Sequence, residues 1–279
     1  MIDRAVVVTG ASSGIGAATV ATLAQRGFIV YAGVRNGADA QRARASHPNV
    51  RPLLLDVTEQ RAIATAAEIV RTGDVPLTGL VNNAGVAFGG PLETLPVDEL
   101  RTQFDVNVIG SVSVTQAFLP LLRAQPSRIV FIGSIAGRIA MPYLAPYCAS
   151  KAALRALADA LRMELAPSNI DVSLIEPGSV ATPIWSKGLA MRDTLLARLP
   201  ASAPAYYRTA IDAIMRALAG EERSSMPVER VAGAVVAALT ARKPKAHYML
   251  GTPARIGALL ALLPPSLHDR FLRATMRLP

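Results

Sequence analysis

Tyr147 and Lys151 lie four residues apart near the start of a stretch, residues 146–166, whose composition predicts a helix. At this spacing the two side chains lie on one face of the helix, one turn apart. An ammonium beside a phenol favours the phenolate, so we expect Lys151 to lower the pKa of Tyr147 from its usual value of about 10. Such a tyrosine can donate or accept a proton near neutral pH. Helices also carry this pair by chance, so the pair alone does not define an active site.

A glycine-rich segment, residues 10–16, follows a short β-branched run and precedes a helical pattern. A strand, a tight turn and a helix in this order direct free backbone N–H groups and the positive end of the helix dipole at a phosphate. Gly10 permits the turn, whereas Gly14 and Gly16 avoid side chains that would block a pyrophosphate or hold the helix away from the strand. The spacing differs by one residue from the usual dinucleotide fingerprint. A glycine-rich loop without a ligand is the alternative.

Three motifs occur in a fixed order: Thr9–Gly16 (TGASSGIG), Asn82–Gly85 (NNAG) and Tyr147–Lys151 (YCASK). As a set they resemble the short-chain dehydrogenase/reductase family, and the resemblance runs from about Ala5 to about Gly251. The segment 176–183 is similar to the steroid- and retinol-type branch of that family. Further positions that match the family are Asp56, Val57, Asn107, Ser134, Pro177, Gly178 and Thr182.

Apolar runs alternate with helical segments along the chain, which predicts a parallel sheet covered by helices on both faces. The expected strands lie near residues 5–9, 28–34, 51–55, 78–81, 128–132, 170–176 and 247–250. The resemblance implies seven strands, mostly parallel, in the doubly wound (Rossmann-type) order. A length of 279 residues suits a single α/β domain of this kind, and two small domains are the alternative.

The resemblance also implies a role for each catalytic candidate. Tyr147 would donate a proton to the developing alkoxide, and Lys151 would lower the tyrosine pKa and hydrogen-bond the nicotinamide ribose. Ser134 follows an apolar strand and would hold the substrate oxygen at the carboxyl end of the sheet. Asn107 would support a proton relay through a water. Ordinary turn and helix chemistry is the alternative for Ser134 and Asn107.

The end of the second strand bears on the choice of cofactor. NAD-binding proteins place a carboxylate there for the ribose 2′-hydroxyl, whereas an arginine accommodates a 2′-phosphate. Val34 stands where the carboxylate is expected and Arg35 follows it. We therefore expect NADP(H), with NAD(H) as the alternative, although Ser12 and Ser13 supply no second cation.

The other cofactor contacts follow from the resemblance alone. The glycine-rich turn would hold the pyrophosphate, and a pair of residues that follows the third strand would hold the adenine. The Asn-Asn-Ala-Gly motif would border the ribose, and the segment after the sixth strand would contact the nicotinamide amide. The residues concerned, in that order, are Gly10, Ser12, Ser13, Gly14, Ile15 and Gly16; Asp56 and Val57; Asn82, Ala84 and Gly85; Pro177, Gly178, Val180 and Thr182. Tyr147 and Lys151 would also contact the cofactor.

The segment 183–226 is about forty-five residues long, which is long for a connection and predicts a substrate-covering element. Apolar residues at helical spacing within it, such as Leu195 and Leu199, fit either a ligand pocket or core packing. We expect an apolar pocket for a steroid-like, retinoid-like, fatty or aromatic carbonyl or alcohol. Its predicted lining residues are Ser134, Met141, Tyr143, Leu144 and Trp185.

The carboxyl-terminal tail, residues 252–279, is apolar and basic. From Arg242 onward seven Lys and Arg stand against one acidic residue, Asp269, in a chain of formal net charge +9. The tail could pack on its own subunit or on an oligomer neighbour, or it could form an interfacial helix on anionic lipid. Nucleic acid explains the charge less well, because no reading motif is present.

The first strand begins almost at once, so we expect no signal peptide and a cytoplasmic protein, with peripheral membrane contact as an addition. Cys148 is the single cysteine and is expected to pack in a helix; no His/Cys cluster predicts a metal site.

The leading function is an NADP-dependent carbonyl reductase or alcohol dehydrogenase, and the resemblance implies a homodimer or homotetramer. The alternatives are an NADP(H)-binding protein without turnover and, within the family, epimerase or dehydratase chemistry.

Overall fold

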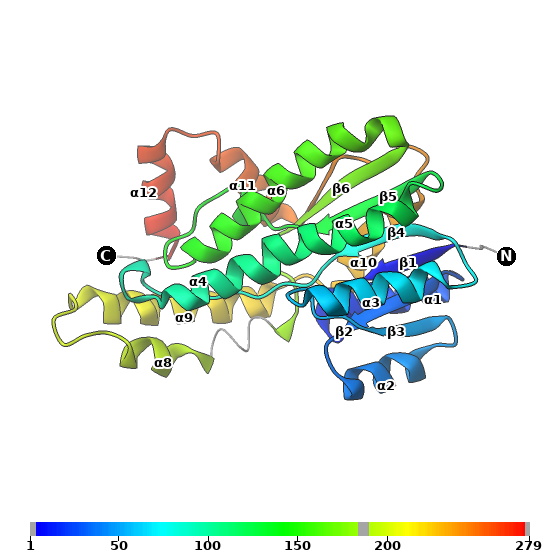
Figure 1. The fold of residues 1–279 in the computed structure, drawn as a ribbon. Coiled ribbons are helices and arrows are strands. Elements are labelled where there is room, and N and C mark those ends of the chain that lie inside the picture. The colour runs from blue at the N-terminus through cyan, green and yellow to red at the C-terminus, as the bar shows by residue number, and fades with distance from the viewer. Residues whose placement is uncertain (1–3, 184–189, 277–279) are drawn as a thin grey trace.

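Seven short apolar runs form one parallel sheet in the computed structural model, which describes residues 4–183 and 190–276 (Figure 1). The strand order is β3-β2-β1-β4-β5-β6-β7. Each expected strand is confirmed to within one residue at either end, and the sheet is parallel throughout. The strands are β1 (Ala5–Val8), β2 (Ile29–Val34), β3 (Val50–Leu54), β4 (Leu77–Asn82), β5 (Ser127–Ile132), β6 (Ile170–Pro177) and β7 (His247–Leu250).

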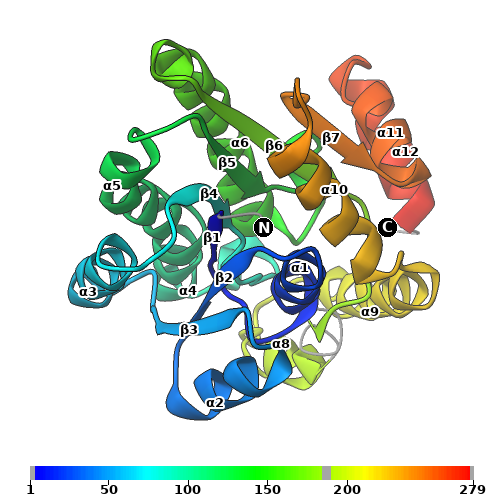
Figure 2. The same ribbon diagram turned by 90° about the vertical axis from the view of Figure 1, so that its right-hand side faces the viewer.

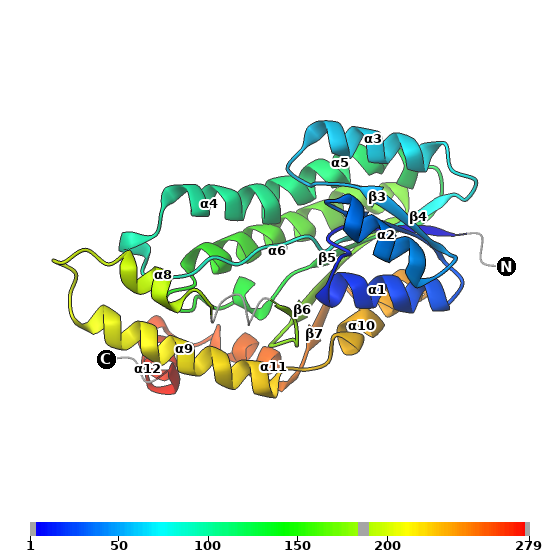
Figure 3. The same cartoon turned by 90° about the horizontal axis from the view of Figure 1, so that it is seen from below.

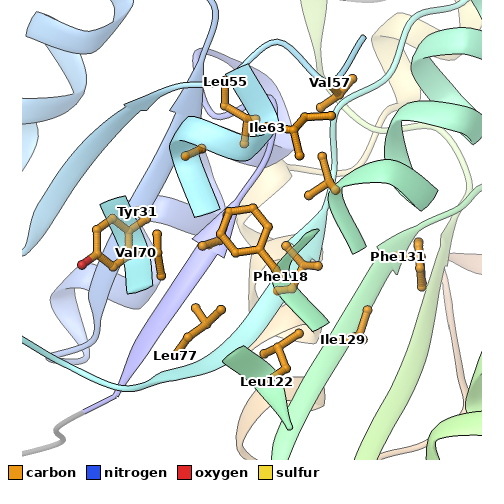
Figure 4. Packing of buried hydrophobic residues seen from close by; sticks show 14 of the residues in the cluster. Tyr31, Leu55, Val57, Ile63, Val70, Leu77, Phe118, Leu122, Ile129 and Phe131 are labelled. Atoms are coloured by element: carbon orange, nitrogen blue, oxygen red, sulfur yellow. The ribbon is translucent and has the colours of Figure 1, made fainter. Parts of the chain in front are cut away.

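Helices cover both faces of the sheet, as the alternating pattern predicts (Figure 2). One face is covered by α1 (Gly14–Gln25), α2 (Gly37–Ser46) and α10 (Val228–Thr240). The other is covered by α3 (Gln60–Arg71), α5 (Gly110–Leu122) and α6 (Ala145–Leu165). The second layer is built around Phe118 of α5, which is fully buried in one cluster with Ile63 and Val70 of α3 (Figure 4).

A long helical stretch precedes the fifth strand. It consists of α4 (Val97–Phe104), a π-helical turn η2 (Asp105–Ile109) and α5. Among the described residues this stretch, Val97–Leu122, is the one helix long and apolar enough to cross a membrane. Its residues Phe118 and Leu122 are fully buried against the sheet, as expected of a core helix.

The described part of the segment 183–226 contains the helices α8 (Arg192–Ala197) and α9 (Tyr206–Ser224), which lie beyond the carboxyl ends of the strands (Figures 1 and 3). The apolar stripe predicted there packs the two helices together, because Leu195, Leu199 and Ile211 form a separate buried cluster. Of the two interpretations of this stripe, the structure therefore supports core packing. Trp185 lies outside the described residues.

The carboxyl-terminal tail folds onto the subunit as α11 (Thr252–Leu260) and α12 (Pro265–Met276). Helix α11 contacts β7 and the 3₁₀ turn η3 (Ile135–Gly137), and α12 contacts α9. Two further 3₁₀ turns, η1 (Leu92–Thr94) and η4 (Ala166–Ser168), complete the described elements.

Candidate active site

The glycine-rich turn joins β1 to α1 at the carboxyl edge of the sheet. Gly10 has φ +62°, a left-handed conformation that disfavours other residues. A side chain at Gly16 would collide with the Gly10 carbonyl oxygen and with Asn83 Nδ2, so only glycine lets α1 begin this close to β1. Ser13, the N-cap of α1, makes no side-chain cap bond, and the first turn carries no acid. The start of α1 is therefore suited to an anion such as a pyrophosphate.

Two residues that the sequence analysis did not assign hold this turn. Thr9 Oγ1 accepts hydrogen bonds from the backbone N–H groups of Asn83 and Ala84, each at 2.9 Å. Asn83 Nδ2 donates to the carbonyl oxygens of Thr9 at 2.8 Å and Gly10 at 3.0 Å. Asn83 lies inside the Asn-Asn-Ala-Gly motif, which is the signal that could have identified it. The side chain of the neighbouring Asn82 instead lies in the core, where its Nδ2 donates to Thr115 Oγ1 at 2.8 Å.

The predicted adenosine residues lie at the same edge, beyond β2 and β3, which pair side by side. Arg35 is exposed directly after β2, and no ion pair to it occurs among the described residues. Asp56 follows β3, and its Oδ1 accepts from the N–H and hydroxyl of Thr58 at 2.9 and 2.7 Å. Val57 is buried against α5, where a side chain at Gly110 would meet it.

The structure brings Ser134, Tyr147 and Lys151 together. Ser134 caps η3, its Oγ accepting from the Ala136 N–H at 3.1 Å, and its hydroxyl lies close enough to the Tyr147 phenol to influence the pKa of that phenol. Tyr147 and Lys151 lie one turn apart in α6, and the Lys151 Nζ is 5.8 Å from the centre of the Tyr147 ring. The lysine is 6% exposed and donates to the Ile132 carbonyl oxygen at 2.8 Å.

Burial sets the pKa values of both groups. Desolvation lowers the pKa of Lys151 to about 8, because burial disfavours the ammonium. Desolvation also raises the pKa of Tyr147, and the nearby Ser134 hydroxyl offsets only part of that rise. The expectation that Lys151 lowers the pKa of Tyr147 is therefore wrong for the structure as it stands. The phenol is protonated at neutral pH, which suits it to donate a proton.

Asn107 lies in the π-helical turn η2 and is fully buried. Its Oδ1 accepts from the Val86 N–H at 2.8 Å, and its Nδ2 donates to the Val86 carbonyl at 3.0 Å and to Ser150 Oγ at 3.0 Å. A side chain at Gly85 would lie 3.4 Å from Asn107 Oδ1 and 3.8 Å from Lys151 Nζ. Asn107 thus fixes the segment after β4 beside the lysine. Its role in a proton relay stays a prediction.

The predicted nicotinamide segment, Pro177–Thr182, lies against the glycine-rich turn. A side chain at Gly14 would be 3.2 Å from the Thr182 methyl group. The segment is held at both ends: the Gly178 N–H donates to the Leu250 carbonyl at 3.1 Å, and the Ala181 N–H donates to the Met226 carbonyl at 2.9 Å. The turn predicted to hold the pyrophosphate and the segment predicted to contact the nicotinamide are therefore neighbours.

A partly buried cluster of polar side chains, which the sequence analysis did not find, lies next to this segment. Glu176, fully buried in β6, accepts two hydrogen bonds from Arg138, at 2.7 and 2.8 Å. His247 Nδ1 lies 2.8 Å from Glu176 Oε2, and its Nε2 lies 2.9 Å from Asp159 Oδ1. Arg138 follows η3, Glu176 precedes Pro177, and Asp159 belongs to α6. The cluster therefore ties together the elements that carry Ser134, the nicotinamide segment and Tyr147.

A cleft of about 380 Å³ opens near the amino end of α6, lined by Pro91, Leu92, Pro142, Tyr143, Tyr206, Tyr207 and Arg273. Tyr143 adopts φ +66°, unusual for a non-glycine residue, and its ring meets that of Tyr207 edge-on at 6.4 Å. Helix α9 thus contacts Tyr143, one of the predicted substrate residues.

Leu144 packs on Gly89, and Met141 donates its N–H to the Cys148 thiol at 3.4 Å. Burial raises the pKa of that thiol, so Cys148 is a packing residue, as predicted.

The cluster predicts an unequal response to two arginine substitutions. Arg138→Met removes both bonds from a buried carboxylate and should lower the free energy of unfolding by about 3 kcal/mol. Arg101→Met, the control, breaks a pair whose side chains are 70% and 90% exposed and should cost less than about 0.5 kcal/mol. Urea unfolding at neutral pH measures both. Equal losses for the two variants would contradict the assignment.

The lowered pKa of Lys151 predicts a pH-dependent stability. Between pH 8 and 10.5 the unfolded chain keeps the lysine proton that the folded protein has lost, so wild-type stability should rise through that window. Lys151→Met lacks this rise. At pH 7 the free energy of unfolding of the variant should exceed that of wild type by up to about 3 kcal/mol, less the cost of leaving the Ile132 carbonyl without its partner. Above pH 8 this advantage should shrink, because wild type becomes more stable. A difference that is constant from pH 7 to 10 would refute the burial of a charged lysine.

Comparison with known proteins agrees with this geometry. The family model for short chain dehydrogenase matches residues 4–193. The NADPH-dependent 3-dehydrocapnine reductase of Ornithobacterium rhinotracheale is 38% identical, over 96% of this chain and 95% of its own. Retinol dehydrogenase 5 of Mus musculus is 36% identical, over 91% of this chain and 82% of its own.

A solved structure gives the same result. The short chain dehydrogenase of Burkholderia cenocepacia J2315, crystallised in complex with NADP, is 29% identical with a TM-score of 0.73, covering 96% of this chain and 97% of that one. The chain therefore belongs to the short-chain dehydrogenase family and is an NAD(P)-dependent oxidoreductase.

Proposed function

We propose that this protein is an NADPH-dependent reductase of a lipophilic ketone or aldehyde, which also oxidises the corresponding alcohol. The observation that carries the proposal is the pair of neighbouring hydroxyls from Ser134 and Tyr147, with a buried lysine one helical turn from the phenol. Two hydroxyls converging from different elements are suited to hold one carbonyl oxygen. The reaction class that needs this arrangement is proton transfer coupled to carbonyl reduction.

The chain's own residues account for the proton and for the charge. A bound nicotinamide would supply the hydride to the carbonyl carbon. Ser134 and Tyr147 would hydrogen-bond the carbonyl oxygen, and Tyr147 would give its proton to that oxygen as the alkoxide forms. The Lys151 ammonium would then stabilise the phenolate left behind, since the attraction of opposite charges is strong in a buried site. Oxidation of the alcohol would run the same steps backwards.

NADP(H) is the proposed cofactor, with NAD(H) as the alternative. The exposed guanidinium of Arg35 at the end of β2 is suited to a 2′-phosphate, and Val34 provides no carboxylate to repel it. The left-handed turn at Gly10 and the uncapped start of α1 suit the pyrophosphate. The name of the reductase relative and the NADP complex of the solved relative support the same choice.

The proposed substrate class rests on the tyrosine-lined cleft. Tyr143 and Tyr207 present ring edges and faces rather than a cluster of cations, so a lipophilic carbonyl fits better than a phosphorylated one. The retinol dehydrogenase relative, whose name denotes a lipophilic alcohol, supports the class.

A second candidate is a protein that binds NADP(H) without turnover. The Ser134 hydroxyl beside Tyr147 argues against it, because binding of the nucleotide alone does not need a hydroxyl placed to hold a substrate oxygen. Binding of NADPH without its oxidation, across a panel of carbonyls graded in size and polarity, would favour this second candidate.

Tyr147→Phe tests the proposed chemistry directly. Without the phenol proton, NADPH oxidation at 340 nm with lipophilic ketones should slow by at least about 100-fold, whereas NADPH binding should change little. Tyr248→Phe removes a phenol in β7 that accepts a bond from the Lys245 N–H and serves as the control. Wild-type turnover by Tyr147→Phe would exclude the proposed acid.

Arg35→Ala tests the choice of cofactor. Loss of a charge-assisted bond to the 2′-phosphate should lower kcat/KM for NADPH by about 10- to 100-fold and leave kcat/KM for NADH nearly unchanged. Arg26→Ala removes an exposed cation at the far end of α1 and should affect neither. A parallel loss with both nucleotides would show that Arg35 does not read the 2′-phosphate.

A further inference from the structure

Large apolar side chains are concentrated on the outer surface of the carboxyl-terminal helices. Within sixteen residues of α11, α12 and the connection between them, several are exposed, Leu259 by 68% and Leu262 by 81%. Figures 1 and 2 show the two helices side by side at the edge of the molecule. We call this region the C-terminal surface; it comprises Ile256, Leu259, Leu262, Leu263, Leu267 and Phe271, with Arg255 and Arg270.

The helices that carry the surface are anchored on their opposite sides. Ala254 is fully buried, and a side chain at Gly257 would lie 2.8 Å from Ile135 Cγ1, so α11 packs directly on η3. Helix α12 contacts α9. Ile256 and Leu259, three residues apart, share the outward face of α11. The exposed apolar groups therefore belong to a packed element that presents them to the outside.

Arginines accompany the apolar groups on both helices. Arg255 precedes Ile256, Arg270 precedes Phe271, and both arginines are exposed. Asp269 is the single acidic residue in the sequence from residue 252 to the end. Two copies of this surface would bring arginines of like charge together with few acids to offset them, whereas a helix lying on a bilayer combines an apolar face with Arg or Lys beside it. The charge pattern favours a negatively charged lipid surface as the occupant.

We propose that the C-terminal surface docks this enzyme on an anionic lipid bilayer. The apolar side chains enter the boundary between headgroups and acyl chains, and Arg255 and Arg270 contact lipid phosphates. The protein lies on the membrane without spanning it, since α11 and α12 are nine and twelve residues long.

The expected strength follows from general magnitudes. Each arginine near an anionic surface strengthens partitioning about five-fold, and each leucine that becomes fully buried strengthens it about ten-fold. Two arginines and several leucines are enough for reversible binding, which added salt should weaken by screening the arginines.

The two helices that carry the C-terminal surface also border the substrate cleft, on their anchored side. Arg273 of α12 lines the cleft with Tyr206 and Tyr207, and α11 packs on the turn that follows Ser134. Docking would therefore place the cleft near the lipid phase, from which a lipophilic carbonyl could enter. This consequence rests on the proposed function, whereas the docking itself does not.

The test is flotation of the full-length protein with phosphatidylcholine–phosphatidylglycerol vesicles and with pure phosphatidylcholine vesicles at low salt. Wild type should bind the anionic vesicles more tightly. Leu259→Ser with Leu262→Ser should weaken that binding by about 100-fold, and Arg255→Gln with Arg270→Gln by about 25-fold. Met163→Ser, an exposed residue of α6, and Arg101→Gln are the matched controls and should bind as wild type.

Thermal midpoints and NADPH binding of every variant, measured without vesicles, establish that the fold and the cofactor site are retained. Wild type that stays unbound to anionic vesicles at low salt overturns the proposal. Equal binding by wild type and the Leu259→Ser, Leu262→Ser variant also overturns it. Light scattering that shows a wild-type oligomer dissociated by the same two substitutions, with no change in vesicle binding, would assign the surface to a second copy of the chain instead.

Discussion

A lysine ammonium in the interior is the constraint on which the rest of the site depends. Lys151 is almost fully buried and has the carbonyl of Ile132, at the end of β5, as its hydrogen-bond acceptor. Its neighbours pack closely around it: a side chain at Gly137 would collide with the Lys151 backbone, and one at Gly85 would lie in contact with its Nζ. The end of β5, the segment after β4 and the turn η3 must therefore all meet at α6.

The same burial accounts for the chemistry. Desolvation holds the pKa of Lys151 near 8 and raises the pKa of Tyr147, so at neutral pH the phenol carries its proton and the lysine is close to titrating. A charge that is costly in the ground state becomes useful when a phenolate forms beside it, because the attraction is little screened there. The lost stability is offset by the core, in which Phe118 and Leu122 are fully buried.

Much of this arrangement could be predicted from the sequence, for local reasons. Most strands are short apolar runs bounded by turns, and Gly10 and Gly16 occupy positions where the backbone tolerates nothing larger. The ordered motifs located Tyr147 and Lys151, and the family resemblance located Ser134; the structure brings the three together. The direction of the Tyr147 pKa was predicted wrongly, because the sequence shows the neighbouring ammonium but not the amount of water that packing removes.

Other features depend on contacts between distant parts of the chain. Arg138, Glu176 and His247 are separated by 38 and 71 residues, and no spacing rule connects them. The left-handed backbone of Tyr143 is likewise a product of its surroundings. The role of Asn83 could have been predicted in part, because its motif was recognised. Two adjacent asparagines, however, give no indication of which side chain faces the turn and which faces the core.

The proposed chemistry depends on the position of one oxygen atom of the substrate. A crystal structure of the protein with NADP⁺ and a bound lipophilic ketone would locate that atom. The ketone oxygen should lie within about 2.6–3.2 Å of both Tyr147 Oη and Ser134 Oγ, with Lys151 Nζ still buried one helical turn from the phenol. A ketone oxygen held elsewhere, with the Tyr147 hydroxyl turned away from the carbonyl carbon, would contradict the proposed chemistry.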